Sequence, residues 1–269
     1  MTSGLSRVVV ALAGLPIVLS IAYIGGWLLF ALVVLVALLA LHELYSVSRS
    51  LRPLTLAGFG AVGAALAGGM LGGADWLLGG LLAVFPLAFV FAAVSETRQS
   101  TTVALATTVF GAAWIGVGLG LLMLLREVPE SRTEGRYWIF GTVITVFVTD
   151  TFAYVGGRVA GRHKMSPVIS PGKTWEGWIF GTVAGMFAAW IVYYHTGYLQ
   201  EWRAFVFGGV VVIAATVGDL FESLVKRDLG VKDTGRLLAG HGGVLDRVDS
   251  LLFAGPAAFF TLLALGALS

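Results

Sequence analysis

Residues 8–41 read VVVALAGLPIVLSIAYIGGWLLFALVVLVALLAL, a run of 34 residues without a charged side chain. One membrane-spanning helix needs roughly 20 apolar residues, so this run is too long for one ordinary span. Gly25 and Gly26 stand near its middle, and we predict that they divide it into two short spans, at 8–24 and 27–42. A single long tilted helix is the alternative. In either form, the stretch places the chain among integral membrane proteins.

The composition of the whole chain agrees with that class. Of its 269 residues, 58% are hydrophobic and 12% are charged, with 37 glycines and a mean hydropathy of +0.91. Soluble domains are usually about half apolar and a quarter charged, whereas glycine is common in packed membrane helices. The chain has no cysteine, which excludes disulfides, thiolate metal sites and cysteine nucleophiles. Its net charge of +2 gives no reason to expect a nucleic-acid partner.

Seven further apolar runs follow the first pair of predicted spans. They lie at about 54–74, 76–95, 101–125, 137–157, 175–194, 203–224 and 250–268. We therefore predict an all-α polytopic integral membrane protein with about nine transmembrane helices, or eight if residues 8–41 form one helix. We divide it into an N-terminal part, 1–136, with about five spans, and a C-terminal part, 137–269, with about four.

The distribution of lysine and arginine predicts the orientation, because these residues are enriched in cytoplasmic loops. With nine spans, 13 of the 17 Lys and Arg residues fall on one side of the membrane. We therefore expect a cytoplasmic N-terminus. The polar loops at 158–174 and 225–249, and any active site that they form, should also face the cytoplasm.

Most ionisable groups lie between residues 150 and 250, so we expect the chemistry there. Asp150 stands inside an apolar span, about 10 Å from its end at the rise of an α-helix. A carboxylate at that depth is costly and by default marks a functional site; pairing with an arginine to fix helix packing is the alternative. Asp219 ends a later span, while Asp246 and Asp249 stand three residues apart before the last one.

Cations and glycines accompany these acids. One basic loop contains two prolines and runs into a new helix, whose N-terminus favours anions. Because the chain lacks thiols, a metal ion would need oxygen ligands, and Mg²⁺ held by carboxylates and substrate phosphates fits. Carboxylates for a metal and cations for phosphate oxygens are typical of phosphoryl transfer. The cations near the acids include Lys173, Lys226, Arg227 and Lys232, and the glycines include Gly242 and Gly243, which follow His241.

Two neighbouring polar residues lie outside this region. His42 and Glu43 end the second predicted span, and we interpret them as interfacial residues, with a supporting role left open.

The polar segment after residue 222 resembles the signature of the phosphatidate cytidylyltransferase (CDP-diacylglycerol synthase) family, S-x-x-K-R-x₄-K-D-x-G-x₅-H-G-G-x-x-D-R-x-D. About a dozen specified positions match at fixed spacing. The upstream blocks SPGKTWEG (170–177) and TDTFAY (149–154) also look like family sequence, so the resemblance spans about residues 140–253. The matching signature residues are Ser223, Lys226, Arg227, Lys232, Asp233, Gly235, His241, Gly242, Gly243, Asp246, Arg247 and Asp249.

The resemblance implies a reaction: CTP and phosphatidate give CDP-diacylglycerol and pyrophosphate, in phospholipid biosynthesis at the cytoplasmic face of a bacterial-type cell (inner) membrane. The lipid phosphate is already an oxyanion, so it can attack the α-phosphorus without a general base. The site must align two polyanions and neutralise the departing pyrophosphate. The resemblance also suggests a homodimer.

The residue roles expected from this reading fall into two groups. As catalytic residues we expect Asp219, Asp246, Asp249, Lys226 and His241, with the three aspartates as Mg²⁺ ligands and Asp249 the second choice among them. As substrate contacts we expect Ser170, Lys173, Ser223, Arg227, Lys232, Gly242, Gly243 and Asp150. Asp150 either orders the site or binds a second cation.

Two other functions are weighed against this one. A CTP-dependent polyprenol or lipid-alcohol kinase would use the same nucleotide but transfer the γ-phosphoryl group and release CDP. A membrane transporter can also carry intramembrane acids and broken helices, but it predicts two similar inverted halves. Here the polar residues crowd into one half of the chain, and the full signature favours the cytidylyltransferase.

Overall fold

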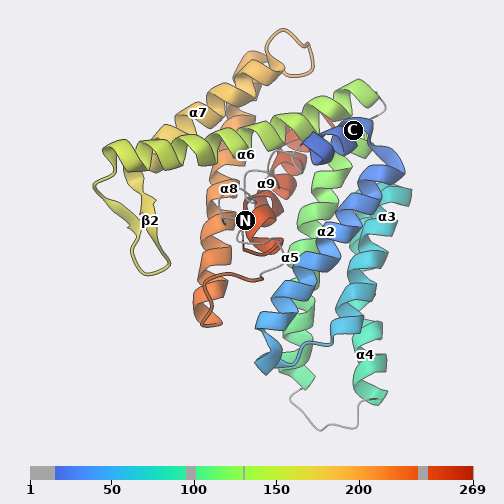
Figure 1. Cartoon of the computed structure of the whole chain (residues 1–269). Helices are drawn as coiled ribbons and strands as arrows, with labels where there is room; N and C mark the ends of the chain where they lie inside the picture. The colour runs from blue at the N-terminus through green and yellow to red at the C-terminus, as the bar shows by residue number, and fades with distance from the viewer. Residues whose placement is uncertain (1–15, 95–100, 130, 236–241, 269) are drawn as a thin grey trace. The chain divides into compact units, whose positions relative to one another are not determined.

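A computed structural model describes residues 16–94, 101–129, 131–235 and 242–268 (Figure 1). The chain forms two compact units. One contains the described residues of Met1–Leu124 and Leu229–Val248, and the other those of Leu125–Asp228 and Asp249–Ser269. The segment between the last two long helices thus belongs with the N-terminal helices.

The first unit is built from apolar helices. Residues 16–24 are helical; α2 (Gly26–Val47), the 3₁₀-helix η1 (Arg49–Leu51), α3 (Thr55–Leu82), α4 (Val84–Val94) and most of α5 (Thr101–Glu127) follow. The predicted break at Gly25 and Gly26 is confirmed. Both residues have positive φ, 73° and 65°, a conformation that glycine adopts without steric strain. The start of the first predicted span lies outside the described residues.

A second pair of glycines interrupts α3. Gly72 and Gly73 leave helical φ/ψ values, and the chain reverses there. The glycines on both sides of the reversal show this, because a Cβ on Gly68 would collide with the Trp76 backbone and a Cβ on Gly80 with that of Ala64. Residues before the break therefore pack against residues after it, which agrees with the predicted division near residue 75.

Within the described residues, seven helical stretches are long and apolar enough to cross a membrane. They are Gly26–Val47, Thr55–Val94, Thr101–Glu127, Arg132–Ala160, Trp175–Tyr193, Glu201–Asp228 and Leu245–Ala264. The prediction of nine spans is not confirmed by this number. The difference lies in the N-terminal region, where the first predicted span is only partly described and Thr55–Val94 counts as one stretch of 40 residues.

Helices α2, α3 and α5 share a core in the first unit. The Tyr45 hydroxyl on α2 donates to the carbonyl of Thr108 on α5 at 2.7 Å, and the Thr108 hydroxyl oxygen accepts from the Leu54 amide at 2.8 Å. Around these bonds the buried side chains are aliphatic.

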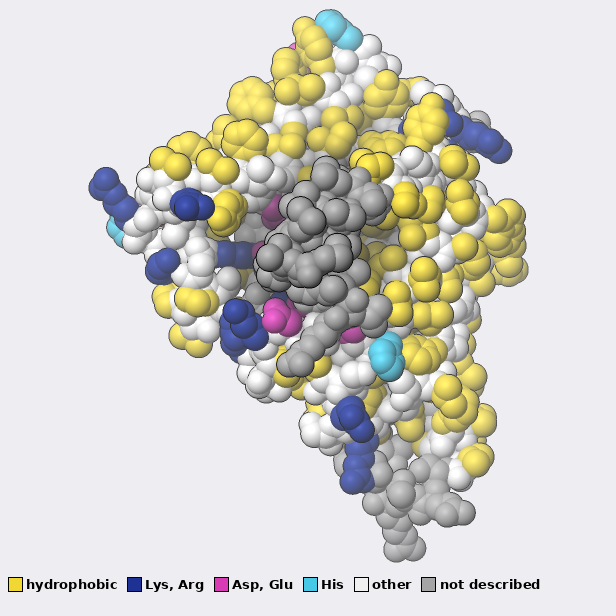
Figure 2. All heavy atoms as spheres, viewed as in Figure 1, with side chains coloured by type: hydrophobic (Ala, Val, Ile, Leu, Met, Phe, Trp, Pro, Cys, Tyr) yellow, Lys and Arg dark blue, Asp and Glu magenta, His cyan; other side chains and the backbone are white. Residues whose placement is uncertain are grey.

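Hydrophobic residues also lie on the surface of the chain. Trp27, Leu71 and Phe89 are exposed, and hydrophobic side chains cover much of the face shown in Figure 2. Apolar surface of this extent suits contact with lipid.

The second unit contains α6 (Arg132–Ala160), α7 (Trp175–Tyr193), α8 (Glu201–Asp228) and most of α9 (Leu245–Ala264). Helices α6 and α7 lie side by side (Figure 1). The buried Gly177, Gly181 and Gly185 line α7 at intervals of four, and a Cβ on each would collide with the backbone or side chains of α6. This spacing of small residues is typical of membrane helices that pack closely.

A two-stranded antiparallel hairpin connects α6 to α7. It consists of β1 (Lys164–Ser166) and β2 (Ser170–Thr174). The described part of the chain is all-α apart from this segment, where a loop was predicted and two short strands are found. Strands of three and five residues interrupted by proline and glycine show too little alternation of polar and apolar residues to predict a strand.

Candidate active site

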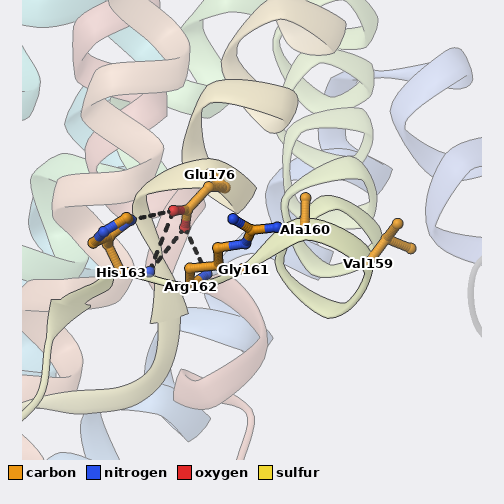
Figure 3. A pocket seen from close by; sticks show the side chains of 6 residues that line it. All are labelled: Val159, Ala160, Gly161, Arg162, His163 and Glu176. Carbon is orange, nitrogen blue, oxygen red and sulfur yellow. Dashed lines mark hydrogen bonds and ion pairs between the residues drawn. The ribbon is translucent and has the colours of Figure 1, made fainter.

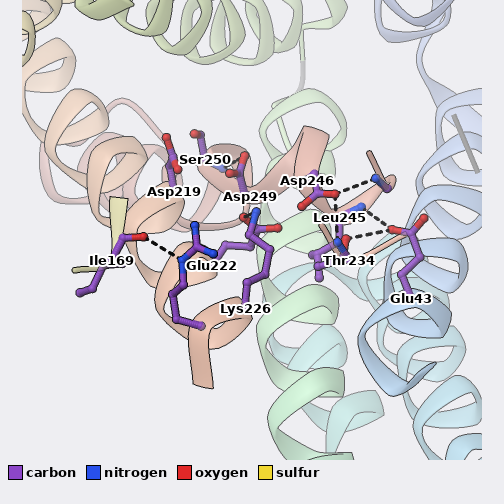
Figure 4. A network of polar contacts seen from close by, with 12 residues as sticks. Glu43, Ile169, Asp219, Glu222, Lys226, Thr234, Leu245, Asp246, Asp249 and Ser250 are labelled. Carbon is purple, nitrogen blue, oxygen red and sulfur yellow. Dashed lines mark hydrogen bonds and ion pairs between the residues drawn. The ribbon is translucent and has the colours of Figure 1, made fainter. Parts of the chain in front are cut away.

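An ion pair joins the hairpin to α8 in the second unit. Nζ of Lys173, on β2, lies 2.6 Å from Oδ2 of Asp219, and the two side chains are 24% and 31% exposed. Further along α8, the Arg227 guanidinium donates from Nε to the Ile169 carbonyl at 3.3 Å (Figure 4). These two contacts hold β2 and its Ser170 and Lys173 beside the polar face of α8. A polar ligand can reach the pair because neither side chain is fully buried.

Two further carboxylates interact electrostatically with Asp219. Asp150, on α6, interacts with both Asp219 and Lys173. Asp249, on α9, interacts with Asp219, Asp150 and Lys226. Three acids and two lysines, from four different elements, thus form one polar cluster in the second unit. Asp150, Asp219 and Asp249 therefore lie near enough to one another to interact electrostatically, and their roles in the site stay predictions.

Close packing of α8 and α9 brings Asp249 to this cluster. A Cβ on Gly218 would lie 2.7 Å from the Asp249 carbonyl oxygen, so only glycine allows the two helices to approach this closely. One turn further along each helix the rings of Phe221 and Phe253 pack, with centroids 5.2 Å apart. Oδ1 of Asp249 accepts a hydrogen bond from the Ser250 amide at 2.7 Å.

Lys226 is held by a glutamate that sequence analysis did not assign to the site. Its Nζ lies 2.5 Å from Oε2 of Glu222, one turn earlier on α8, and the Glu222 side chain is only 1% exposed. A buried carboxylate at this spacing keeps the lysine on the polar face of the helix. The spacing of four residues was visible in the sequence, but the burial of Glu222 was not.

In the first unit, Asp246 organises the signature segment. Its Oδ2 accepts hydrogen bonds from the Gly243 amide at 2.7 Å and the Thr234 amide at 3.1 Å (Figure 4). Gly242 has a φ of 81°, and a Cβ there would lie 2.7 Å from the same oxygen. Asp246 therefore connects Thr234 and Gly243, which lie on either side of residues 236–241 in the chain. His241, a predicted catalytic residue, lies outside the described residues.

The structure places the remaining predicted contacts as follows. Ser170 begins β2 and is half-buried, Ser223 is half-buried on α8, Lys232 is exposed in the segment after α8, and Gly243 is buried next to the start of α9.

The donor set suits a hard cation, although the described residues form no compact metal site. Among the described residues no group of three or more His, Asp or Glu side chains is placed to hold a metal ion. Asp219 and Asp249 belong to the second unit and Asp246 to the first. The chemistry of the donors nevertheless fits Mg²⁺, because Asp150, Asp219 and Asp249 offer carboxylate oxygens. The magnesium site at Asp219, Asp246 and Asp249 stays a prediction.

A separate pocket lies where the hairpin leaves α6. Its lining includes Arg162, His163 and Glu176 (Figure 3). Glu176, in the first turn of α7, lies with Oε1 2.6 Å from Nδ1 of His163, and its Oε2 accepts from the Arg162 amide at 3.1 Å. Glu176 therefore fixes the two residues that precede β1 to the start of α7. Sequence analysis gave this glutamate no role.

Comparison with known proteins extends the resemblance to nearly the whole chain. The model of a family described as the cytidylyltransferase family matches residues 5–265. A phosphatidate cytidylyltransferase from Staphylococcus haemolyticus is 33% identical over 256 residues, which cover 93% of this chain and 95% of that protein. One from Mycobacterium bovis is 36% identical over 259 residues, which cover 86% of this chain and 79% of that protein. The chain therefore belongs to the cytidylyltransferase family of enzymes.

Proposed function

We propose that this chain transfers the cytidylyl group of CTP to phosphatidate and releases pyrophosphate. The observation that carries this proposal is the polar cluster of the second unit. There, three aspartates and Lys226 on helices apolar enough to cross a membrane interact with one another and with Lys173 of the hairpin. A lipid phosphate and a nucleotide triphosphate are the substrates such a cluster suits. The relatives whose names specify phosphatidate support the lipid substrate.

The proposed reaction is a direct displacement at phosphorus. An oxygen of the phosphatidate phosphate attacks the α-phosphorus of CTP and forms a new P–O bond. The bond from that phosphorus to the oxygen bridging the β-phosphate breaks, and pyrophosphate leaves with the electron pair. The attacking oxygen is already anionic, so no general base is needed. The protein must align two polyanions and offset their charge.

Lys173 and Lys226 are the proposed contacts to the phosphates. Each ammonium group is already held by a carboxylate, Asp219 or Glu222. Charges that are positioned before the reaction stabilise a transition state more effectively than charges that must reorganise. Further proposed contacts are Ser170, Ser223, Arg227, Lys232, His241 and the backbone at Gly242 and Gly243.

The proposal includes Mg²⁺, with Asp219, Asp249 and Asp246 as its ligands. When bound, the ion would offset phosphate charge and polarise the α-phosphoryl group. Asp246 also braces the signature loop, because two backbone amides donate to its Oδ2. For Asp150, its interactions with Asp219 and Lys173 support the ordering role that we propose. We further propose that the site faces the cytoplasm, as the basic loops suggest.

The proposal is tested with purified protein in detergent micelles. Pyrophosphate release should require CTP, phosphatidate and Mg²⁺ together. Asp219→Asn should lower turnover by about 100-fold or more, because a charged group that acts on the transition state is lost. Release of CDP in place of pyrophosphate would indicate a lipid-alcohol kinase. Full activity of Asp219→Asn would exclude the proposed role of this aspartate.

A further inference from the structure

A buried glutamate of α2 contacts the signature segment within the first unit. Glu43 lies near the end of α2 and is 3% exposed. Its Oε2 accepts hydrogen bonds from the Leu245 amide at 2.9 Å and from the Thr234 hydroxyl at 3.4 Å (Figure 4). Glu43 is therefore buried against the signature segment, which agrees with the supporting role left open for it. Its neighbour His42, in contrast, is exposed.

Glu43 acts as a cap for α9, although it comes from a helix about 200 residues earlier in the chain. Leu245 is the first residue of α9, and the first amides of a helix have no partner within that helix. Val244, which precedes it, has no side-chain oxygen to accept such a bond. A carboxylate is also favoured by the positive end of the helix dipole. Glu43 thus supplies the hydrogen-bond acceptor that Val244 lacks.

Two glycines of the signature leave room for the Glu43 carboxylate. A Cβ on Gly235 would collide with its Oε1, and a Cβ on Gly243 with its Oε2. Oε1 is buried and has no hydrogen-bond partner among the described residues. The carboxylate therefore fills a space bounded by Gly235, Thr234, Gly243 and the start of α9. One side chain contacts the loop on both sides of residues 236–241.

We propose that Glu43 is a positioning residue for cytidylyl transfer. By holding Thr234, Gly243 and Leu245, it sets the place of Asp246, whose Oδ2 accepts from the amides of the same loop. An apolar side chain would fill this space without the cost of burying a charge. Burial of a charged group is costly unless the group is hydrogen-bonded or paired. The inference rests on the proposed function, in which Asp246 is a magnesium ligand and the backbone at Gly242 and Gly243 contacts phosphate.

The first test compares Glu43→Ala and Glu43→Gln in the full-length protein. Glu43→Ala should lower kcat for CTP and phosphatidate by about 100-fold, the typical effect of a small displacement of reacting groups. The KM for phosphatidate should stay unchanged, because the proposed role of Glu43 is to position Asp246 and not to bind the lipid. Glu43→Gln keeps an acceptor oxygen for Leu245 and Thr234 and should recover most of the lost rate. Glu201→Gln, at an exposed glutamate in the first turn of α8, is the matched control.

The second test uses the steric contact between Gly235 and Glu43. Gly235→Ala should lower kcat, because its methyl group displaces the carboxylate. In a Glu43→Ala background the same change should cost much less, since the smaller side chain leaves room for the methyl group. Such non-additivity is expected only for residues in direct contact. Gly63→Ala is the control, because no atom within 4 Å would meet its Cβ.

The outcomes separate this inference from the proposed function. If wild-type protein turns over CTP with phosphatidate, and Glu43→Ala keeps the wild-type kcat, the positioning role is excluded. If the wild type shows no such turnover, the proposed function fails, and amide exchange at Leu245 still tests the contact: Glu43→Ala should accelerate it. If Glu43→Ala lowers the melting temperature too far for an assay, Glu43→Gln decides. A Glu43→Gln protein that melts normally but has lost its turnover would contradict the proposal that the acceptor oxygen at this position places Asp246.

Discussion

Lys173 reaches Asp219 from a hairpin, and the pair is open enough for a ligand to contact it. Lys173→Met keeps much of the side-chain length but removes the charge. It should lower kcat by about 100- to 1000-fold, the usual effect of losing one preorganised donor to a transition state. Lys164→Met, at an exposed lysine of the other strand, should leave turnover unchanged. Equal kcat values for the two variants, measured as pyrophosphate release, would exclude Lys173 from the site.

At the scale of residues, sequence analysis identified the groups that carry charge at the site but not those that hold them. Asp150, Asp219 and Asp249 were predicted because acids in or near apolar spans are unusual. The burial of Glu43 and of Glu222 was not predicted, for a physical reason. Whether a carboxylate at a helix end is solvated or buried depends on which segment packs over it, and that partner can be far away in the sequence. Among the described residues, Glu43 is covered by Thr234, Gly235, Gly243 and Leu245.

Helix α7 illustrates how an element positions the hairpin. Its glycines allow α6 to approach, and the hairpin begins and ends on these two helices. Gly181→Leu should force the pair apart and lower the free energy of unfolding by about 1–3 kcal/mol, the usual cost of overpacking. Val183→Leu, at an exposed position of the same helix, should change it little. Thermal melting in detergent measures both. A Gly181→Leu protein with the same melting temperature as Val183→Leu would contradict the packing described for α6 and α7.

Sequence analysis predicted the elements well where hydropathy or glycine pairs decided the structure. The break at Gly25 and Gly26 and the reversal at Gly72 and Gly73 both occur close to their predicted positions. The last helix begins at Leu245, five residues before its apolar run, because its first turn is polar and supported by Glu43. The hairpin could not be predicted, since its strands are stabilised by pairing and by contacts to α8.

At the scale of the whole molecule, orientation is open to a direct test because the chain has no cysteine. Helix α7 has 19 residues and is about 28 Å long, enough for one crossing. Single cysteines in place of Arg162 and His195, which flank α7, should therefore react from opposite sides of the membrane. A membrane-impermeant maleimide added to intact cells should label only the His195→Cys protein. Labelling of Arg162→Cys alone would reverse the proposed orientation, and labelling of both from one side would contradict a crossing by α7.

The fold class of the whole molecule followed from composition, whereas its division into two units did not. The segment Leu229–Val248 belongs with the N-terminal helices, although its signature residues continue into the second unit. Hydropathy identifies which segments enter the membrane but carries no information about which helices pack together, since lipid-facing and helix-facing surfaces are similarly apolar. The family match, in contrast, covers both units.

The position of the transferred phosphorus distinguishes the proposed reaction from that of a kinase. Wild-type protein in micelles is given phosphatidate, Mg²⁺ and CTP labelled either at the α- or at the γ-phosphorus. We expect the α-label to enter the lipid in an amount equal to the pyrophosphate released, and the γ-label to remain in that pyrophosphate. Entry of the γ-label into the lipid, with release of CDP, would contradict cytidylyl transfer.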